Sequence, residues 1–157
     1  MQIPAYHRPT IRSDAAGEGN FLASRGERVH FGVDYLAPAG TKVCLERPAT
    51  FIKEGIAYAS TTRYKYVEFR DRDFYIRYFY VAFGALNWGR GHNVAAGTVF
   101  GTMQDIADHY PDSGMHNHCH LTVHKLGAEG VDGFKSVYHA KKDRTYFDPE
   151  DYLDGKL

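Results

Sequence analysis

The sequence has no excess of charge of either sign, because 19 aspartates and glutamates balance its 19 lysines and arginines. No long run of one sign breaks this balance. Proteins that hold a phosphate backbone or an anionic membrane surface gather basic residues into a patch or stripe. The composition therefore argues against nucleic acid as a partner.

Long hydrophobic runs are absent as well. No apolar stretch approaches the roughly 20 residues that a helix needs to span a bilayer. The first residues, Met-Gln-Ile-Pro-Ala-Tyr-His-Arg-Pro, lack the apolar centre of a signal peptide. We therefore expect a soluble chain with no membrane span and no export signal.

Cysteine is scarce, with Cys44 and Cys119 as the two examples in the sequence. Two cysteines are too few for a disulfide framework, and these two do not form a Cys-x-x-Cys pair. We predict that both are small buried residues. A single disulfide between them is the alternative.

Short runs rich in Val, Ile, Tyr and Phe, such as residues 64–69 and 74–83, lie between frequent turn signals. Runs of this length and composition are typical of strands. A helical turn is predicted at Met103–His109, and Pro111 keeps it short. With 157 residues, 43% of them hydrophobic, we expect one mainly antiparallel β domain with its own core.

Four of the nine histidines lie in residues 114–124. Apolar and polar residues alternate from 118 to 124, which is the period of a strand with one buried face. His118 and His120 then project from one face, with α-carbons roughly 7 Å apart. This spacing allows one imidazole to bind a metal while the other contacts the water bound to that metal. Taken alone, the pair is better explained by a polar sheet face that happens to be rich in histidine, and only a second set of ligands would favour a metal site.

A second set of candidate ligands lies at His30 and Asp34, which share a face of the alternating stretch 29–35. A fully extended strand would separate their α-carbons by about 13 Å, too far for one ion. The segment must therefore bend, and Gly32 is placed to permit it. A surface histidine and a solvated aspartate explain either residue alone. Two imidazoles with one carboxylate form the ligand set typical of catalytic zinc.

On these motifs the chain resembles the lysostaphin/LytM-type zinc endopeptidases of bacterial cell walls. The resemblance runs in the family's order over residues 19–153. The matching stretches are 19–25 (Gly-Asn-Phe-Leu-Ala-Ser-Arg), 30–34 (His-Phe-Gly-Val-Asp), 37–43 (Ala-Pro-Ala-Gly-Thr-Lys-Val), 91–102, 118–123 (His-Cys-His-Leu-Thr-Val) and 147–153 (Phe-Asp-Pro-Glu-Asp-Tyr-Leu).

The resemblance implies one Zn²⁺ per chain, held by His30, Asp34 and His120. It also implies that His118 is the general base for the zinc-bound water. His116 competes for either role if the register shifts. The implied fold is a twisted antiparallel sheet that forms a groove, with the zinc site on its concave face. Residues 1–18 are then an N-terminal arm, partly on the surface, and residues 154–157 a C-terminal tail.

The chain departs from the family at Tyr80, which stands where the family has a further catalytic histidine. A tyrosine hydroxyl can donate a hydrogen bond to the same oxyanion. The alternative is that Tyr80 merely packs in a sheet. Residues 76–81, together with Tyr110-Pro111, also resemble vertebrate chemotaxin-like relatives, which are regarded as non-peptidases. Similar tyrosine strands occur in bacterial and phage sequences as well.

The resemblance favours a zinc metalloendopeptidase that hydrolyses stem or cross-bridge peptides of peptidoglycan, next to glycine or D-alanine. One rival is an inactive zinc-containing module that binds a cell-wall peptide or a protein. Another is a histidine-rich metal buffer. We expect action in the cell wall or periplasm. Without an export signal, the protein is released by lysis, carried by a phage virion, or has lost a leader, and a phage lysin or virion part is favoured. The substrate-binding residues are unassigned.

Overall fold

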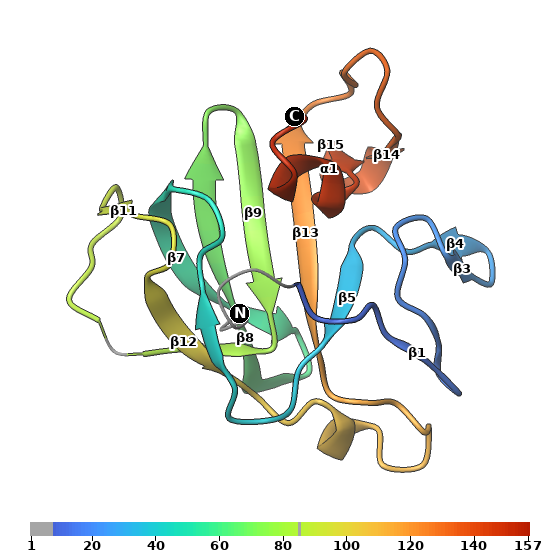
Figure 1. Cartoon of the computed structure of the whole chain (residues 1–157). Helices are drawn as coiled ribbons and strands as arrows, with labels where there is room; N and C mark the ends of the chain where they lie inside the picture. Colours follow the sequence, from blue (N-terminus) through green and yellow to red (C-terminus); the bar gives the residue numbers. More distant parts are fainter. Residues whose placement is uncertain (1–7, 85) are drawn as a thin grey trace.

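A computed structural model describes residues 8–84 and 86–157, and its largest element is an antiparallel sheet (Figure 1). The strands of this sheet follow the order β11-β7-β8-β9-β13-β15-β14, and β5 also pairs with β13. They are β5 (Val33–Leu36), β7 (Ala49–Tyr58), β8 (Thr61–Asp71), β9 (Phe74–Phe79), β11 (Asn93–Val94), β13 (His118–Leu126), β14 (Ser136–His139) and β15 (Arg144–Phe147).

A smaller sheet of order β10-β12-β6 and two short ribbons complete the strands of the described chain. The smaller sheet contains β6 (Lys42–Cys44), β10 (Val81–Phe83) and β12 (Val99–Met103). The ribbons pair β1 (Ser13–Asp14) with β2 (Gly17–Glu18), and β3 (Ser24–Arg25) with β4 (Arg28–Val29). Three helical segments are short: η1 (Ala107–His109), η2 (Ala140–Lys142) and α1 (Pro149–Leu153). The predicted mainly antiparallel β architecture is confirmed.

Strand β13 is the centre of the large sheet (Figure 1). One of its edges pairs with β9 over residues 120–124. The other edge pairs with β5 over residues 118–121 and with β15 over residues 123–126. The β5 register sets Asp34 directly opposite His120, on the same face of the sheet.

The core lies on the opposite face of β13. Cys119, Leu121 and Val123 are all fully buried there. The smaller sheet contributes to the same core through Phe100, whose ring meets that of Phe69 edge-on at 4.8 Å between centroids. Alternation along β13 therefore sends the apolar residues into the core and the histidines to the other face, as the sequence predicts.

Several predictions about local structure were wrong. The strand predicted over 74–83 is interrupted at Tyr80, where the backbone has a φ of 66°. The helical turn predicted at Met103–His109 begins only at Ala107, because Met103 ends β12. Cys119 is buried as predicted, but Cys44 is only half-buried. Helix α1 was not predicted; Asp148 caps it by accepting a hydrogen bond from the Glu150 amide at 3.0 Å.

Residues 10–12 lie against strand β5 of the large sheet. Ile11 bridges Tyr35 of β5, and the Arg12 amide donates to the Asp34 carbonyl at 2.8 Å. The Arg12 side chain is almost fully buried. This part of the predicted N-terminal arm therefore packs beside a predicted metal ligand, whereas residues 1–7 lie outside the described residues.

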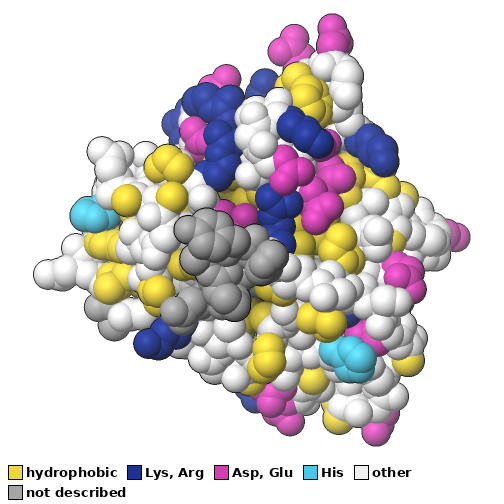
Figure 2. Space-filling model, in the orientation of Figure 1, with side chains coloured by type: hydrophobic (Ala, Val, Ile, Leu, Met, Phe, Trp, Pro, Cys, Tyr) yellow, Lys and Arg dark blue, Asp and Glu magenta, His cyan; other side chains and the backbone are white. Residues whose placement is uncertain are grey.

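Two global features of the described residues agree with the composition: the helices and the distribution of surface charge. No helix among residues 8–84 and 86–157 has the length and apolar content to cross a membrane. Basic and acidic side chains interleave on the face in Figure 2. This mixture is what the balanced composition leads one to expect.

Both faces of β13 are covered, although the alternation predicts one buried face. His124 is 1% exposed and lies between the rings of Tyr75 and Tyr146, at centroid distances of 5.4 Å from each. Its Nδ1 atom has no hydrogen-bond partner among the described residues. Burial lowers the pKa of His124 to about 3, and the nearby charges of Arg144 and Arg77 act in the same direction.

We predict that His124 limits stability in acid. An unfolded histidine takes up its proton near pH 6.5, whereas the buried one stays neutral down to about pH 3. The free energy of unfolding should therefore fall as the pH drops through this window, by up to about 1.4 kcal/mol per pH unit from this group. In the variant His124→Phe, the free energy of unfolding measured with urea should depend less on pH between these two values. The same change at the exposed His92 is the control, and an equal effect there would contradict the prediction.

Candidate metal centre

Three side chains from two separate segments converge on one point. Nδ1 of His120 lies 2.7 Å from Oδ1 of Asp34 and 3.0 Å from Nε2 of His30. Nε2 of His30 is 3.2 Å from the same carboxylate oxygen. These atoms all lie within 4.8 Å of one another, and they form the one such group among the described residues. The structure thus brings together the three residues predicted as ligands.

The donor atoms fit a zinc ion. Nδ1 of His30 faces the Asn20 carbonyl at 2.9 Å, so its proton is donated there and the lone pair of Nε2 points into the cluster. Zinc bonds of about 2.0–2.1 Å at tetrahedral angles place ligand atoms roughly 3.3–3.4 Å apart. The observed separations of 2.7–3.2 Å need only a small outward shift to reach that spacing.

Gly32 makes this convergence possible. His30 lies outside β5, and the chain bends at Gly32 before the strand begins. A Cβ atom on Gly32 would overlap the Leu121 carbonyl oxygen and would lie 2.9 Å from Cε1 of His120. The predicted bend is confirmed. Its physical basis is close backbone approach to β13, because the structure records no positive φ at this glycine.

His118 lies beside the three predicted ligands and is oriented by the backbone of His116. Its Nδ1 atom is 2.8 Å from the His116 carbonyl oxygen, which leaves Nε2 facing Asp34 at 3.8 Å from Oδ2. The side chain is almost fully buried. Burial lowers the pKa of His118, although the charge of Asp34 opposes that change. His118 is therefore a neutral imidazole with one nitrogen available.

His116 does not join the group, although the sequence left it as a competitor for either role. It precedes β13, and its side chain is 62% exposed. Its Nδ1 atom lies 3.9 Å from Oδ2 of Asp14.

Tyr80 also reaches this site. Its ring meets that of His118 edge-on, with centroids 5.4 Å apart. Its hydroxyl lies 3.0 Å from the Tyr58 hydroxyl. Burial raises the pKa of Tyr80 to about 12, and the hydrogen bond with Tyr58 acts in the opposite direction. The phenol therefore stays protonated at neutral pH.

The Tyr80 backbone is held in a left-handed conformation that tyrosine rarely adopts. Its amide donates to the Lys65 carbonyl at 2.7 Å, and its carbonyl accepts from the Gln104 amide at 2.8 Å. The Gln104 side chain also accepts a hydrogen bond from the Lys65 amide and donates one to the Arg63 carbonyl. Strain of this kind persists only where the surroundings over-determine it, and such positions cluster at functional sites.

Arg12 is a site residue that the sequence analysis missed. Its Nε and Nη2 atoms donate to Oδ2 of Asp34 at 3.2 and 3.0 Å, and its Nη1 donates to Asp14 at 2.6 Å. Asp14 in turn accepts from the His116 amide at 2.9 Å. Arg12 therefore links a predicted metal ligand to the segment that orients His118. The local sequence carries no motif that would reveal this role.

The electrostatics of Asp34 follow from these contacts. Burial acts to raise its pKa, but the ring nitrogens of His120 and His30 outweigh burial and hold that pKa well below its usual value. One carboxylate oxygen faces the histidines and the other faces Arg12. The carboxylate is therefore ionised, and Oδ1 is the oxygen that is available to a metal.

We predict that Gly32→Ala weakens zinc binding by about tenfold and lowers the free energy of unfolding by about 1–3 kcal/mol, because the added methyl forces β5 and β13 apart. Calorimetric zinc titration and urea unfolding would measure the two effects. Gly89→Ala is the matched control, since nothing lies within 4 Å of an added Cβ there. Equal behaviour of the two variants would refute the role of Gly32.

A second prediction concerns Arg12. Replacing Arg12→Met leaves two buried carboxylates without their partner and should cost about 3–5 kcal/mol in the free energy of unfolding. Urea unfolding in the presence and absence of zinc would measure this loss. Arg63→Met removes the exposed ion pair with Asp108 and should change little. A similarly small loss for Arg12→Met would show that the buried network is not needed.

Comparison of the sequence with protein-family models gives no match, and comparison with curated proteins gives none. Solved structures do match. The catalytic domain of the antimicrobial peptidase lysostaphin from Staphylococcus simulans has a TM-score of 0.56 and 18% identity, with 88% of this chain and 90% of that one covered. The solution structure of lysostaphin has a TM-score of 0.57 and 18% identity, with 91% and 50% covered. Helicobacter pylori Csd3 has a TM-score of 0.52 and 21% identity, with 76% and 30% covered.

The chain thus spans half of the lysostaphin chain in its solution structure and less than a third of the Csd3 chain, but most of the isolated catalytic domain. At these identities the likeness concerns the fold. The protein therefore has the lysostaphin-type peptidase fold that its sequence motifs imply.

Proposed function

We propose that the protein is a zinc-dependent endopeptidase that hydrolyses peptide bonds of bacterial cell-wall peptidoglycan. The observation that carries this proposal is the convergence of His30, Asp34 and His120 beside the buried His118. The lysostaphin-type fold supports it, because the similar catalytic domain is that of a peptidase. The substrate class comes from the motif resemblance.

In this proposal His30, Asp34 and His120 hold the zinc ion. When bound, zinc lowers the pKa of its water and polarises a substrate carbonyl. The two histidines are suited to ligation because burial lowers the pKa of His120 and the Asn20 carbonyl sets the tautomer of His30. Arg12 holds the second oxygen of Asp34 and so keeps the carboxylate in place.

His118 is the proposed general base. The His116 carbonyl occupies its Nδ1 atom, so Nε2 is the nitrogen that accepts a proton from the attacking water and passes it to the leaving amine. His118 and His120 are neighbours on one face of β13, and this places the base next to a ligand. A fixed tautomer and a buried ring orient the base before substrate binds.

Tyr80 is the proposed donor to the oxyanion that forms on the substrate carbonyl. Its hydroxyl stays protonated at neutral pH and its ring contacts that of His118. A neutral phenol lacks the charge of an imidazolium. This missing charge favours the second candidate function, a zinc-containing module that binds a wall peptide or a protein without cleaving it.

Action on peptidoglycan places the protein in the cell wall or periplasm. We propose a phage product, released by lysis or carried by a virion, as its origin. Purified peptidoglycan tests the activity without any assumption about the route.

The deciding experiment is mass spectrometry of peptides that zinc-loaded protein releases from purified Gram-negative and Gram-positive peptidoglycan, with a chelated control. Release that disappears on chelation would establish the endopeptidase and identify the bond. No release from either wall, despite one tightly bound zinc per chain, would favour the binding module. Several weakly bound zinc ions per chain would point to the metal buffer.

We predict that Tyr80→Phe lowers the kcat for peptide release by about 10²–10³ and changes KM little, because an oxyanion donor acts mainly in the transition state. Tyr78→Phe is the control, since that ring is buried in the core on the opposite face of β9. If both variants retain the activity of the unmodified protein, Tyr80 serves only to pack the sheet.

A further inference from the structure

We propose that Tyr58 and Tyr110 are positioning residues that direct the hydroxyl proton of Tyr80 toward the substrate oxyanion. This inference rests on the proposed function and assigns a role to two residues for which the sequence motifs provide none. The three phenols form a continuous chain of hydrogen bonds that ends at Tyr80, whose ring meets that of His118.

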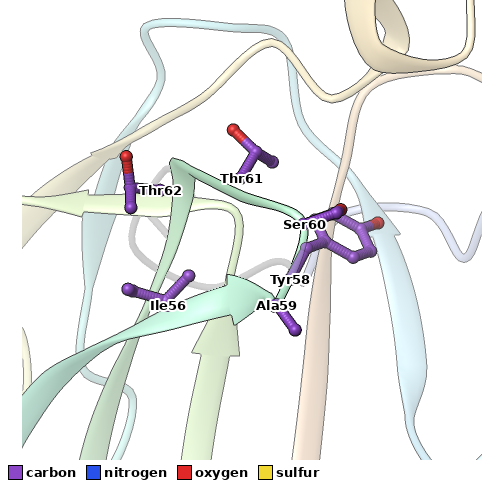
Figure 3. A pocket seen from close by; sticks show the side chains of 6 residues that line it. All are labelled: Ile56, Tyr58, Ala59, Ser60, Thr61 and Thr62. Atoms are coloured by element: carbon purple, nitrogen blue, oxygen red, sulfur yellow. The ribbon is translucent and has the colours of Figure 1, made fainter.

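The chain is built from three separate segments. Tyr58 ends β7, Tyr80 lies between β9 and β10, and Tyr110 follows η1. The Tyr110 hydroxyl donates to that of Tyr58 at 3.1 Å, and the Tyr58 and Tyr80 oxygens are 3.0 Å apart. Figure 3 shows Tyr58 at the β7–β8 turn, where it lines a hollow of about 590 Å³.

The chain of hydroxyls can run in either of two directions. The geometry permits either Tyr58 or Tyr80 to donate to the other. A phenol has a single proton to donate, although its oxygen can accept. Tyr58 accepts from Tyr110 and still has its own proton to donate, and we assign that proton to Tyr80. The Tyr80 proton then remains available to the substrate.

The opposite direction would remove this function. If Tyr80 donated to Tyr58, its only proton would be held by Tyr58 and would not be available to the oxyanion. Donation through the chain also polarises each successive hydroxyl, because hydrogen bonds in series strengthen one another. Tyr110 and Tyr58 therefore act on the orientation and acidity of the Tyr80 hydroxyl without touching the substrate.

Packing holds the members of the chain in place. The rings of Tyr58 and Tyr80 are nearly parallel, at 19° and 6.0 Å between centroids. His109 stacks on Tyr58 at 5.2 Å, and Tyr64 meets both Tyr58 and Tyr80 edge-on. Because the left-handed backbone of Tyr80 is fixed by Lys65 and Gln104, its hydroxyl has little freedom to leave the chain.

Tyr64 provides a matched control. It belongs to the same aromatic cluster, but its hydroxyl donates to the Asp105 carbonyl at 3.0 Å and lies outside the chain. Tyr64→Phe therefore removes the same atom as Tyr58→Phe from the same packing environment. A difference between these variants reports on the hydroxyl chain and not on general loosening of the cluster.

The test is a double-mutant cycle for peptide release by the zinc-loaded protein. We expect Tyr58→Phe to lower kcat about threefold to tenfold, the equivalent of one neutral hydrogen bond, with KM and zinc content unchanged. Tyr110→Phe should act in the same direction but less. In the Tyr80→Phe background, Tyr58→Phe should have no further effect. An equal effect in both backgrounds, or one no larger than that of Tyr64→Phe, would overturn the inference.

A binding measurement keeps this test separate from the proposed function. A glycyl phosphinate dipeptide carries a tetrahedral oxyanion and can be titrated calorimetrically into the zinc-loaded variants. If the unmodified protein releases no peptide, the proposed function fails. Weaker phosphinate binding in Tyr58→Phe, by threefold to tenfold and only when Tyr80 is present, would still support the hydroxyl chain. Equal phosphinate affinity of the unmodified protein and Tyr58→Phe, or no binding by the unmodified protein, would refute the hydroxyl chain.

Discussion

The site depends on the close approach of the chain at Gly32 to strand β13. A side chain there would overlap the Leu121 carbonyl oxygen, so only glycine lets the two backbones come this close. The contact turns His30, which lies before β5, toward His120. Pairing of β5 with β13 then sets Asp34 opposite the same histidine. An extended chain would hold His30 and Asp34 about 13 Å apart at their α-carbons, and the bend brings their side chains into contact.

This convergence has an electrostatic cost, and Arg12 offsets it. A buried ion pair is weak evidence for stability, because desolvation consumes much of its Coulomb energy. The contribution of the Arg12–Asp34 ion pair here is to hold the side chains in position. Arg12 engages one oxygen of Asp34, the histidines face the other, and Asp14 carries the network to the His116 amide. One buried guanidinium therefore links the predicted metal ligand Asp34 to the segment that orients His118.

Sequence reasoning could find the parts of the site that local periodicity encodes. The alternation along residues 118–124 places His118 and His120 on one face, and the spacing of His30 and Asp34 requires a bend at Gly32. Arg12 and Tyr58 belong to none of the matching stretches, and the resemblance at Tyr110-Pro111 gave Tyr110 no role. Strand register and loop packing bring these residues to the site. The break in the strand at Tyr80 was also hidden, because residues 74–83 have uniform strand composition.

Tyr80 presents two features that ring packing alone does not explain. Packing accounts for its contacts with Tyr58 and Tyr64, since aromatic rings favour such arrangements anywhere. It does not account for the left-handed backbone, which is costly for a tyrosine and would be relieved by glycine or asparagine at the same position. Nor does it account for a chain of hydroxyls that ends at Tyr80, whose ring meets that of a buried histidine. In the proposed function a neutral phenol takes the place of an imidazole as oxyanion donor, which requires that its proton be aimed at the substrate. The strained turn and the two neighbouring tyrosines are the features that we propose direct it.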